Sequence, residues 1–450
     1  MKVIITGVGK SGTSLVKDLL REKHNVTVID SDQKVVQYIV DRYDVSGIVG
    51  SGYEKSTLLS AGVENADLLV ATTPSDEVNI LCCIISKKLD VKHTVARVRD
   101  PKYFSQMTEI REELGIDYIF NPDYYVAESI CNVLRFPFAK EVDVFAGGKV
   151  TLVKVDIEEK NPLINKSMAG INREYKSGVL FALVLREGKT VVPHGDFVIN
   201  EGDSVYILAT DTEITNFFRK LHSYKQKTKL AFIAGGGRTT HYLTEFLSEY
   251  SVKVKIIESD KSKAEELAST FPTADVCFGD ATDSEILSDE GIADFDAFVA
   301  LTDKDEENIV ISMYATDLDI KKVVTKVESP FFYGIEKRFD LDTVVSPQDV
   351  SVNHVLKLVR SYQALSYGNI SALFKFGGDC EIVEFKVGKD FQGIGIPIRN
   401  LKVKNDVLIG GVVRDGEFNV ATGETTIEKG DSVLIVTESG LITDINQILK

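Results

Sequence analysis

The stretch ITGVGKSG, residues Ile5–Gly12, contains two overlapping glycine motifs. Its G-K-S at positions 9–11 matches the end of a P-loop, a turn whose backbone wraps the phosphates of ATP or GTP. Gly7, Gly9 and Gly12 instead have the spacing G-x-G-x-x-G of a dinucleotide-binding turn. The first motif predicts an NTP hydrolase, and the second predicts a nucleotide-binding domain without hydrolytic machinery.

The flanking residues favour the dinucleotide motif. A P-loop needs another glycine five residues before the glycine of its G-K-S, and that position is Ile4, inside the apolar run KVIIT. The dinucleotide turn needs a strand before it, a helix after it and an acid about 20 residues further on, and Asp30 supplies the acid. Asp30 can accept hydrogen bonds from ribose hydroxyls, and its charge disfavours the 2′-phosphate of NADP. The sequence therefore predicts a Rossmann-type nucleotide site.

Each glycine has a predicted role in this turn. Gly7 permits the tight turn, Gly9 lets a pyrophosphate approach the backbone, and Gly12 lets the helix pack closely on the strand. The phosphates are then expected at the helix N-terminus.

Composition excludes several classes of protein. The chain has 450 residues, enough for two to four domains at roughly 100–200 residues each, and a formal net charge of −16. This charge argues against binding to nucleic acid or anionic lipid, which need clustered lysine and arginine. Five cysteines without ligand spacing favour a reducing compartment. With no visible signal peptide and no apolar run near the ~20 residues of a spanning helix, we expect a soluble cytoplasmic protein.

The chain contains the same pattern twice. KVIITGVGKSG at Lys2 corresponds to KLAFIAGGGRTT at Lys229, and the ribose acid Asp30 corresponds to Glu258, 228 positions later. Near the end of each half, INEGDSVYILAT corresponds to IEKGDSVLIVTE at the same offset. The protein is therefore predicted to be two fused copies of one two-part unit.

The two parts of each copy differ in pattern. The first alternates short β-branched strands with amphipathic helices and predicts an α/β fold, a Rossmann-like doubly wound parallel sheet. The second, rich in strands and turn residues, predicts a small α+β domain. The predicted domains are 1–122 (Rossmann-like), 123–140 (linking helix), 141–224 (small domain), 225–347 (Rossmann-like), 348–368 (linking helix) and 369–450 (small domain). The apolar stretch Tyr118–Phe138 is compatible with either a core linker helix or a partner-facing helix.

Further motifs at later strand ends carry a family resemblance. They are Gly50-Ser51-Gly52, Ala71-Thr72-Thr73 and the run Ala96–Pro101, ARVRDP. With these motifs each copy resembles a regulator-of-potassium-conductance (RCK) unit, and the pair resembles the peripheral regulatory subunits of Trk-type potassium-uptake systems. The resemblance implies binding of NAD(H) and of ATP or ADP, and assembly as a homotetramer. It also implies docking at the inner face of the membrane on a potassium-translocating subunit whose opening the tetramer controls.

The resemblance also implies a set of nucleotide-binding residues in the first copy. The turn would hold the phosphates, residues after the third strand would flank the adenine, and two threonines would close the pocket. Arg97 would be the main cation for phosphate oxygens, with Arg99 a weaker candidate. The set is Gly7, Val8, Gly9, Lys10, Ser11, Gly12, Asp30, Gly50, Ser51, Thr72, Thr73, Arg97 and Arg99.

The second copy departs from the pattern. Thr240 replaces the third glycine, Lys326 replaces Arg97, and Glu328 replaces Arg99. Lysine lacks the bidentate fork of arginine, and a glutamate facing inward would repel phosphate. The corresponding set is Gly235, Gly237, Arg238, Thr239, Glu258, Asp280, Ala281, Leu301, Thr302 and Lys326. We expect the two sites to differ in ligand preference or occupancy, unless these strand residues only face solvent at the rim.

An NAD-dependent oxidoreductase is the alternative function. It would need a substrate domain with a general acid or base, and neither small domain offers an evident pair. No catalytic residue is therefore predicted. The six histidines are dispersed, so no metal site is predicted, and the acidic run at Asp303–Glu307 is expected to be a helix N-terminus.

Overall fold

The computed structural model describes residues 1–176, 178–221, 227–332, 339, 341–365, 370–376, 380–438 and 442–450. It contains two compact units. The first comprises Met1–Cys131 with Thr228–Leu356, and the second comprises Asn132–Lys227 with Lys357–Lys450. The first unit thus holds both Rossmann-like copies and the second holds both small domains. The predicted domain ends near residues 224 and 368 lie outside the described residues, and the domain boundaries stay predictions.

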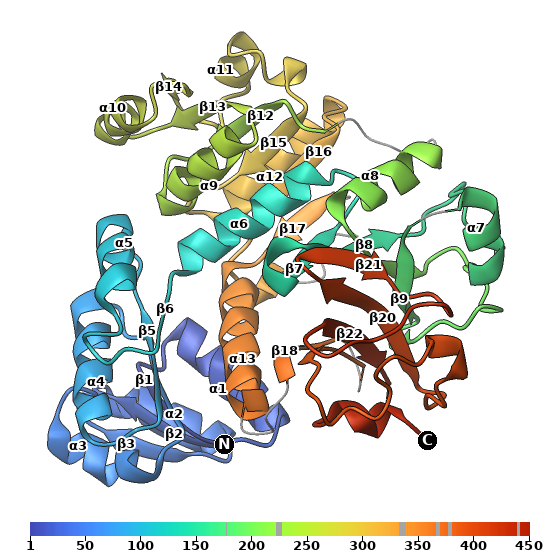
Figure 1. The fold of residues 1–450 in the computed structure, drawn as a ribbon. Coiled ribbons are helices and arrows are strands. Elements are labelled where there is room, and N and C mark those ends of the chain that lie inside the picture. Colours follow the sequence, from blue (N-terminus) through green and yellow to red (C-terminus); the bar gives the residue numbers. More distant parts are fainter. Residues whose placement is uncertain are drawn as a thin grey trace. The chain divides into compact units, whose positions relative to one another are not determined.

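The first Rossmann-like copy is a six-stranded parallel sheet in the order β3-β2-β1-β4-β5-β6 (Figure 1). Its strands are β1 Lys2–Thr6, β2 Asn25–Asp30, β3 Ser46–Val49, β4 Leu68–Ala71, β5 His93–Arg97 and β6 Tyr118–Phe120. Its helices are α1 Lys10–Arg21, α2 Gln33–Arg42, α3 Lys55–Ser60, α4 Asp76–Lys88 and α5 Pro101–Ile110. The chain order reverses between β1 and β4, and such a switch point is where doubly wound sheets bind ligands.

The second copy repeats this topology, with the order β14-β13-β12-β15-β16-β17 and only parallel pairs. Its strands are β12 Leu230–Ala234, β13 Lys253–Glu258, β14 Asp275–Phe278, β15 Ala297–Ala300, β16 Lys322–Lys326 and β17 Thr343–Val345. Its helices are α9 Arg238–Glu249, α10 Lys261–Thr270, α11 Ser284–Asp289 and α12 Asp305–Asp317. The predicted duplication of a doubly wound sheet is confirmed.

Burial explains why these segments form a sheet with helices on its faces. The central strand β4 is buried along its whole length, as a parallel strand covered on both faces requires. Helix α1 buries Leu15, Val16 and Leu19 on one face while its lysines remain exposed. Ile4, the residue that argues against a P-loop, is buried inside β1.

A linking helix follows each sheet, α6 at Pro122–Arg135 and α13 at Pro347–Leu365. Within the first unit, each linking helix begins against the first helix of the other copy. Asn121, just before α6, donates from Nδ2 to the hydroxyl of Tyr242 on α9 at 2.9 Å. Gln348 on α13 donates to the Ser14 hydroxyl on α1. The apolar stretch at the start of α6 is buried within the chain, with Val126 and Ala127 fully covered.

The second unit holds two five-stranded antiparallel sheets, β10-β9-β11-β8-β7 and β18-β19-β22-β20-β21. The first contains β7 Glu141–Phe145, β8 Val150–Asp156, β9 Leu180–Arg186, β10 Lys189–Val191 and β11 Ser204–Ala209, with α7 Met168–Tyr175 and α8 Asp211–Lys220. The second contains β18 Ile370–Lys375, β19 Glu381–Lys386, β20 Val407–Arg414, β21 Glu417–Val420 and β22 Ser432–Thr437. One apolar core joins them, with Leu183 and Leu208 packed in the same cluster as Ile382 and Leu434. The predicted small α+β domains are confirmed.

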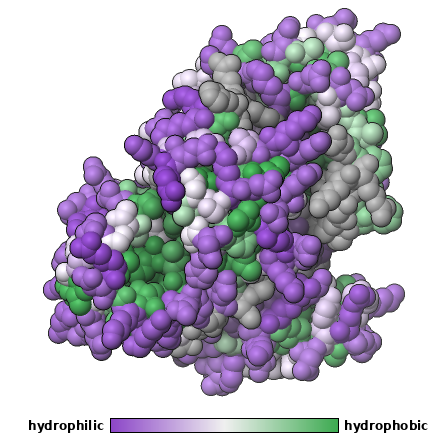
Figure 2. Space-filling view, turned by 90° about the vertical axis from the view of Figure 1, so that its right-hand side faces the viewer, coloured by the Kyte–Doolittle hydropathy of each residue, from purple (hydrophilic) through white to green (hydrophobic). Residues whose placement is uncertain are grey.

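Short 3-10 helices complete the described elements: η1 Val63–Asn65, η2 Ala146–Gly148, η3 Ile292–Asp294, η4 Pro330–Phe332, η5 Ile398–Asn400 and η6 Ile445–Ile448. Polar residues predominate on the face of the molecule shown in Figure 2. Among the described residues, no helix is long and apolar enough to cross a membrane. The described residues also contain no group of three or more histidine, cysteine, aspartate or glutamate side chains that could hold a metal ion. His222 lies outside the described residues.

An ion pair between a buried aspartate and a partly exposed arginine recurs in both small domains. Arg186 donates from Nε and Nη2 to the two carboxylate oxygens of Asp203, each at 2.7 Å, and the backbone N–H of Asn200 adds a third bond at 2.8 Å. Arg414 and Asp431 repeat this arrangement 228 positions later. Burial alone would raise the pKa of the Asp203 carboxyl, but the hydrogen bonds from Arg186 and Asn200 outweigh it and the pKa is lowered.

Replacement of Asp203 by asparagine is expected to destabilise the first small domain by about 2 kcal/mol at neutral pH, the order of a charge-assisted hydrogen bond. Because the folded pKa of Asp203 is depressed, its stabilisation is complete above the unfolded pKa of about 4 and is lost as pH falls through the lower folded value. Thermal unfolding at pH 7 and in this acidic range measures the difference. The exposed Asp196→Asn is the control, and equal midpoints for the two variants would contradict the prediction.

Candidate nucleotide-binding site

The candidate site lies at the carboxyl edge of the first sheet. Because the strands are parallel, the residues that end or follow them meet at one edge. Gly7 follows β1, Asp30 ends β2, Gly50 follows β3, Thr72 follows β4 and Arg97 ends β5. The structure therefore brings the predicted residues of five strands to one crevice at the switch point.

The three glycines of the turn have different surroundings. Gly7 has φ +83°, and a Cβ there would lie 2.6 Å from the backbone nitrogen of Thr73. A Cβ at Gly12 would lie 2.3 Å from the carbonyl oxygen of Gly7. A Cβ at Gly9 would have no atom within 4 Å. Gly7 and Gly12 are thus required by close packing inside the protein, whereas Gly9 leaves open space in front of the helix.

Helix α1 presents its N-terminus to that open space. Its N-cap is Gly9, which provides no side-chain hydrogen bond to the first turn. The first backbone N–H groups of a helix have no partner within the helix, and the helix dipole places partial positive charge there. Lys10 and Ser11 follow directly, and Lys10 is exposed. This end of α1 is suited to a phosphate group.

Asp30 holds the turn in place. Its carboxylate accepts hydrogen bonds from the backbone N–H of Val8 at 2.9 Å and of Asp32 at 3.0 Å. A carboxylate has about four lone-pair sites, so capacity remains for ribose hydroxyls. In the second copy Glu258 has the same two roles, accepting from Gly236 at 2.6 Å and Asp260 at 2.7 Å.

Asn79 connects the ends of β4 and β5 by hydrogen bonds to Thr73 and Arg97, and the predicted site did not include it. Its Oδ1 accepts from the backbone N–H and the hydroxyl of Thr73, at 2.8 and 2.7 Å. Its Nδ2 donates to the carbonyl oxygens of Thr73 at 3.0 Å and Arg97 at 2.9 Å. Asn308 makes the corresponding backbone bonds to Thr302 and Lys326. The signal in the sequence was an asparagine at the same place in both copies.

Arg97, at the end of β5, is a half-buried cation of the crevice. Its Nη2 donates to the carbonyl oxygen of Thr73 at 2.7 Å, while its buried Nε has no partner among the described residues. Burial lowers the pKa of Arg97, and the nearby positive charge of Arg99 acts in the same direction. A guanidinium with unused donors in a dry environment is well suited to phosphate oxygens.

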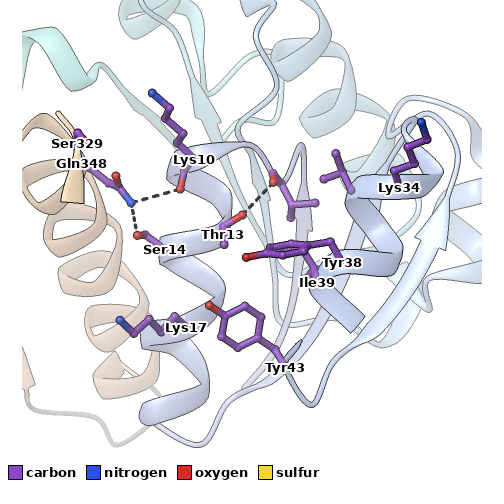
Figure 3. A pocket seen from close by; sticks show the side chains of 12 residues that line it. Lys10, Thr13, Ser14, Lys17, Lys34, Tyr38, Ile39, Tyr43, Ser329 and Gln348 are labelled. Atoms are coloured by element: carbon purple, nitrogen blue, oxygen red, sulfur yellow. Dashed lines mark hydrogen bonds between the residues drawn. The ribbon is translucent and has the colours of Figure 1, made fainter. Parts of the chain in front are cut away.

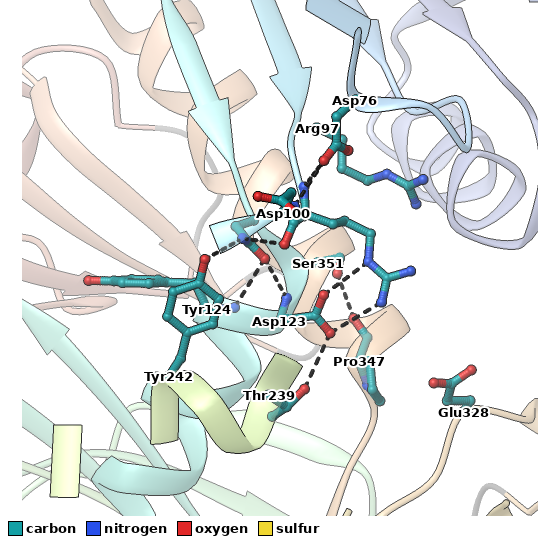
Figure 4. A network of polar contacts seen from close by, with 12 residues as sticks. Asp76, Arg97, Asp100, Asp123, Tyr124, Thr239, Tyr242, Glu328, Pro347 and Ser351 are labelled. Atoms are coloured by element: carbon teal, nitrogen blue, oxygen red, sulfur yellow. Dashed lines mark hydrogen bonds and ion pairs between the residues drawn. The ribbon is translucent and has the colours of Figure 1, made fainter. Parts of the chain in front are cut away.

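Arg99 has a different partner. It donates to both carboxylate oxygens of Asp123, at 3.0 and 3.2 Å, and Asp123 also accepts from the hydroxyl of Thr239 on α9 (Figure 4). Thr239, predicted to contact a nucleotide in the second copy, is thus engaged with the first copy's linking helix. A phosphate role for Arg99 would require it to exchange Asp123 for the ligand, and stays a prediction.

The second copy differs from the first around its turn. A Cβ at Gly237 would have no atom within 4 Å, as at Gly9, and Arg238 is exposed. Thr240 fits in place of the third glycine, and its hydroxyl donates to the carbonyl oxygen of Gly235 at 2.6 Å. The close approach seen between Gly12 and Gly7 is therefore relaxed in the second copy.

The later strand ends of the second copy also differ. Lys326 is buried and lies 3.7 Å from the carboxylate of Glu328. Leu301 stands where Thr72 donates to the carbonyl oxygen of Gly7 in the first copy, so that bond has no counterpart. Asp280 accepts two hydrogen bonds from Thr282 in its own turn, and the adjacent Ala281 is buried. At the end of β16 the second crevice thus offers a phosphate a lysine that already has an acidic neighbour, whereas Arg238 at the start of α9 remains exposed.

Comparison with known proteins identifies the family. The model of the TrkA-N domain matches residues 3–122 and 231–347, and the model of the TrkA-C domain matches residues 152–222 and 382–450. The chain belongs to the TrkA family. The Trk system potassium uptake protein TrkA of Halomonas elongata is 31% identical over 457 residues, with 100% of this chain and 99% of that protein covered. The match extends over both copies and both small domains.

Solved structures with the same fold include the GsuK RCK domain, at 18% identity and a TM-score of 0.64, with 97% of this chain and 92% of that chain covered. A GsuK channel bound to NAD matches at 16% identity and a TM-score of 0.64, with 97% of this chain and 77% of that chain covered. At these identities the likeness concerns the fold. It confirms that the tandem arrangement of this TrkA-family chain is an RCK fold.

Two hollows border the crevice. The larger, of about 570 Å³, lies between α1 and α2 and shares only Val8 and Lys10 with the predicted nucleotide site (Figure 3). The other, of about 450 Å³, places Lys10 among the acidic residues Asp303, Asp305, Glu306 and Glu328. Asp305 and Glu306 lie in the first turn of α12, the helix N-terminus predicted from the acidic run.

Replacement of Arg97 by methionine is expected to weaken ADP binding while leaving the free energy of unfolding almost unchanged. The half-buried charge is partly desolvated in the unliganded protein, so its removal should change the free energy of unfolding by less than about 1 kcal/mol. Affinity for ADP should fall by about 10- to 100-fold, because a charge-assisted contact to phosphate is lost. Isothermal titration calorimetry and thermal unfolding give the two values. The affinity of Arg97→Lys for ADP is expected to lie between those of the wild type and Arg97→Met. Wild-type affinity in Arg97→Met would contradict a role for Arg97 in phosphate binding.

Proposed function

We propose that this chain is a nucleotide-responsive regulatory subunit of a Trk-type potassium-uptake system. NAD(H) or an adenine nucleotide binds the first crevice, and the bound state changes how the subunit acts on a membrane potassium-translocating partner. The observation that carries the proposal is the crevice itself. It combines an uncapped helix N-terminus, the open space at Gly9 and the half-buried guanidinium of Arg97, whose Nε has no partner among the described residues.

The comparisons support this function. The relative from Halomonas elongata is named as a Trk system potassium uptake protein, and one of the structures with this fold is titled as a channel bound to NAD. We propose NAD(H), ATP and ADP as ligands of the first crevice, with Asp30 for a ribose, Arg97 for phosphates, and Gly50 and Ser51 beside the base. The second crevice, with Lys326 in place of arginine, is proposed to bind more weakly or to prefer a different ligand.

Regulation of this kind needs no chemistry on the ligand. A ligand shifts an equilibrium only by its difference in affinity for two states, typically about 1–3 kcal/mol per site. Several sites in a homotetramer, peripheral at the cytoplasmic face of the membrane through its partner, would add these small shifts.

Two measurements test parts of this proposal. Light scattering of the purified protein measures its mass and so tests the predicted homotetramer. A hydride-transfer assay with small hydroxy and keto acids tests the oxidoreductase alternative, for which we expect no turnover.

Replacement of Gly9 by aspartate is expected to abolish nucleotide binding while preserving the fold. Aspartate is a favoured N-cap residue, and a Cβ at this position meets no other atom. Its carboxylate would occupy the first-turn N–H groups and repel phosphate, so affinity for NADH and ATP should fall by about 100-fold or more. Calorimetric titration measures the affinity. Potassium uptake by cells that carry this subunit with its membrane partner should then no longer follow ligand level.

Gly237→Asp is the matched control, because that position is equally open in the second copy. It should leave the first site intact and remove only the binding that belongs to the second. Nucleotide binding and ligand-dependent uptake unchanged in Gly9→Asp would overturn the proposed function.

A further inference from the structure

The hollow between α1 and α2 has a cationic lining in an acidic protein. Lys10 and Lys17 come from α1, and Lys34 comes from α2. Among the described residues none of the three has an ion-pair partner, and no acidic side chain lines the hollow. Lys10 also borders the neighbouring hollow with its acidic residues, so the positive charge of this hollow rests chiefly on Lys17 and Lys34, in a chain with a net charge of −16.

Two tyrosines lie between these lysines. Figure 3 shows the ring of Tyr38 between α1 and α2 and that of Tyr43 below it, with Lys10, Lys17 and Lys34 around these rings and their ammonium groups directed outward. Tyr38 is 56% exposed; Arg42 donates to its hydroxyl at 3.0 Å and lies 5.9 Å from the centroid of its ring, which leaves the rest of the ring open to a ligand. The hollow has a volume of about 570 Å³, within the roughly 300–1,000 Å³ typical of small-molecule sites.

The wall of the hollow comes from both copies. Gln348, at the start of α13, donates to the Ser14 hydroxyl and, at 3.4 Å, to the carbonyl oxygen of Lys10. Ser329 also lines the hollow from the second copy. A molecule bound here would touch the contact between the second linking helix and α1.

The duplication supplies an internal comparison. At the corresponding places in the second copy, 228 positions later, Glu245 replaces Lys17, Ser262 replaces Lys34 and Glu266 replaces Tyr38. The rings of His241 and Phe271, which correspond to Thr13 and Tyr43, are in edge-to-face contact with centroids 5.0 Å apart. Arg238 stands where Lys10 does, but the other two lysines are absent and the aromatic rings pack together, so the fold does not require Lys17 and Lys34.

We propose that the hollow between α1 and α2 binds a small anion that carries phosphate groups at two or more positions of a flat ring system, such as a doubly phosphorylated nucleoside. The lysines at separate sides bind separate phosphates, and the tyrosine rings contact the flat ring. This site adjoins the nucleotide crevice, with which it shares Val8 and Lys10, and its existence does not depend on the proposed function.

A single tryptophan tests the proposal directly. The chain contains no tryptophan, so Tyr38→Trp places one fluorescent reporter in the hollow. Titration with adenosine 3′,5′-bisphosphate should give a saturable change in emission, and inorganic tripolyphosphate should bind more weakly. The exposed Tyr250→Trp, in the second copy, should show no such change. Equal affinity for the two probes would overturn the role of the tyrosine rings.

Substitutions that change the charge of two lysines, made in the Tyr38→Trp protein, test whether these lysines bind the phosphates. Lys17→Glu with Lys34→Ser introduces the residues of the second copy, and affinity for the bisphosphate should fall by about 10-fold or more. Lys55→Glu with Lys88→Ser makes the same charge change at exposed positions outside the hollow and should leave affinity within about 2-fold. Absence of a saturable signal, or equal weakening by both pairs, would overturn the proposal. NADH affinity, measured separately by calorimetry, reports on the crevice, so failure of one site is distinguishable from failure of the other.

Discussion

Replacement of Gly12 by alanine is expected to destabilise the first nucleotide-binding copy by about 3 kcal/mol, the upper end of the usual cost of overpacking. The added Cβ would lie 2.3 Å from the carbonyl oxygen of Gly7 and 3.3 Å from the hydroxyl oxygen of Thr72. The first of these is a backbone atom that cannot rotate away, so α1 must move from the turn. Denaturant unfolding followed by circular dichroism measures the loss.

Two variants control for this effect. Gly9→Ser, in the same turn, meets open space and supplies a favoured N-cap, so stability should change by less than about 0.5 kcal/mol. Thr240→Ala, at the corresponding position of the second copy, removes only one hydrogen bond and should cost about 1 kcal/mol. A cost for Gly12→Ala no larger than for Thr240→Ala would show that the turn of the first copy is not held as closely as the structure indicates.

The contrast between these glycines shows what a local sequence motif can predict. The spacing of the motif, the strand before it and Asp30 after it were sufficient for the fold, because each is a local requirement of one strand-turn-helix unit. The 228-residue offset then extended the prediction to the second copy.

Contacts between segments that are distant in the sequence could not be predicted from the motif. Arg99 was predicted to face a phosphate, and its ion pair with Asp123 depends on how α6 begins beside β5. Gln348 reaches α1 only because the linking helices contact the opposite copies, an arrangement that no local spacing encodes. The cationic hollow was missed for the same reason, since its lysines are spaced as exposed helix residues and only the packing of two helices gathers them.

Replacement of Asn79 by leucine is expected to cost about 4 kcal/mol, the largest loss among these variants. The side chain of Asn79 is completely buried and makes four hydrogen bonds, to the backbone N–H, hydroxyl and carbonyl of Thr73 and to the carbonyl of Arg97. Leucine has a similar volume, so packing is kept while these groups lose their partners, at about 1–3 kcal/mol for each buried group left unpaired. Denaturant unfolding measures the cost.

The second copy separates the structural effect from the functional one. Asn308 is equally buried and makes the matching backbone bonds, so Asn308→Leu should lower stability by a similar amount. Only Asn79→Leu should also weaken NADH binding in the first crevice, because Asn79 fixes the ends of the strands that carry Thr73 and Arg97. If both variants weakened NADH binding equally, the asparagine would act through the general stability of the unit. If Asn79→Leu cost less than about 1 kcal/mol, the four bonds would not hold the strand ends together.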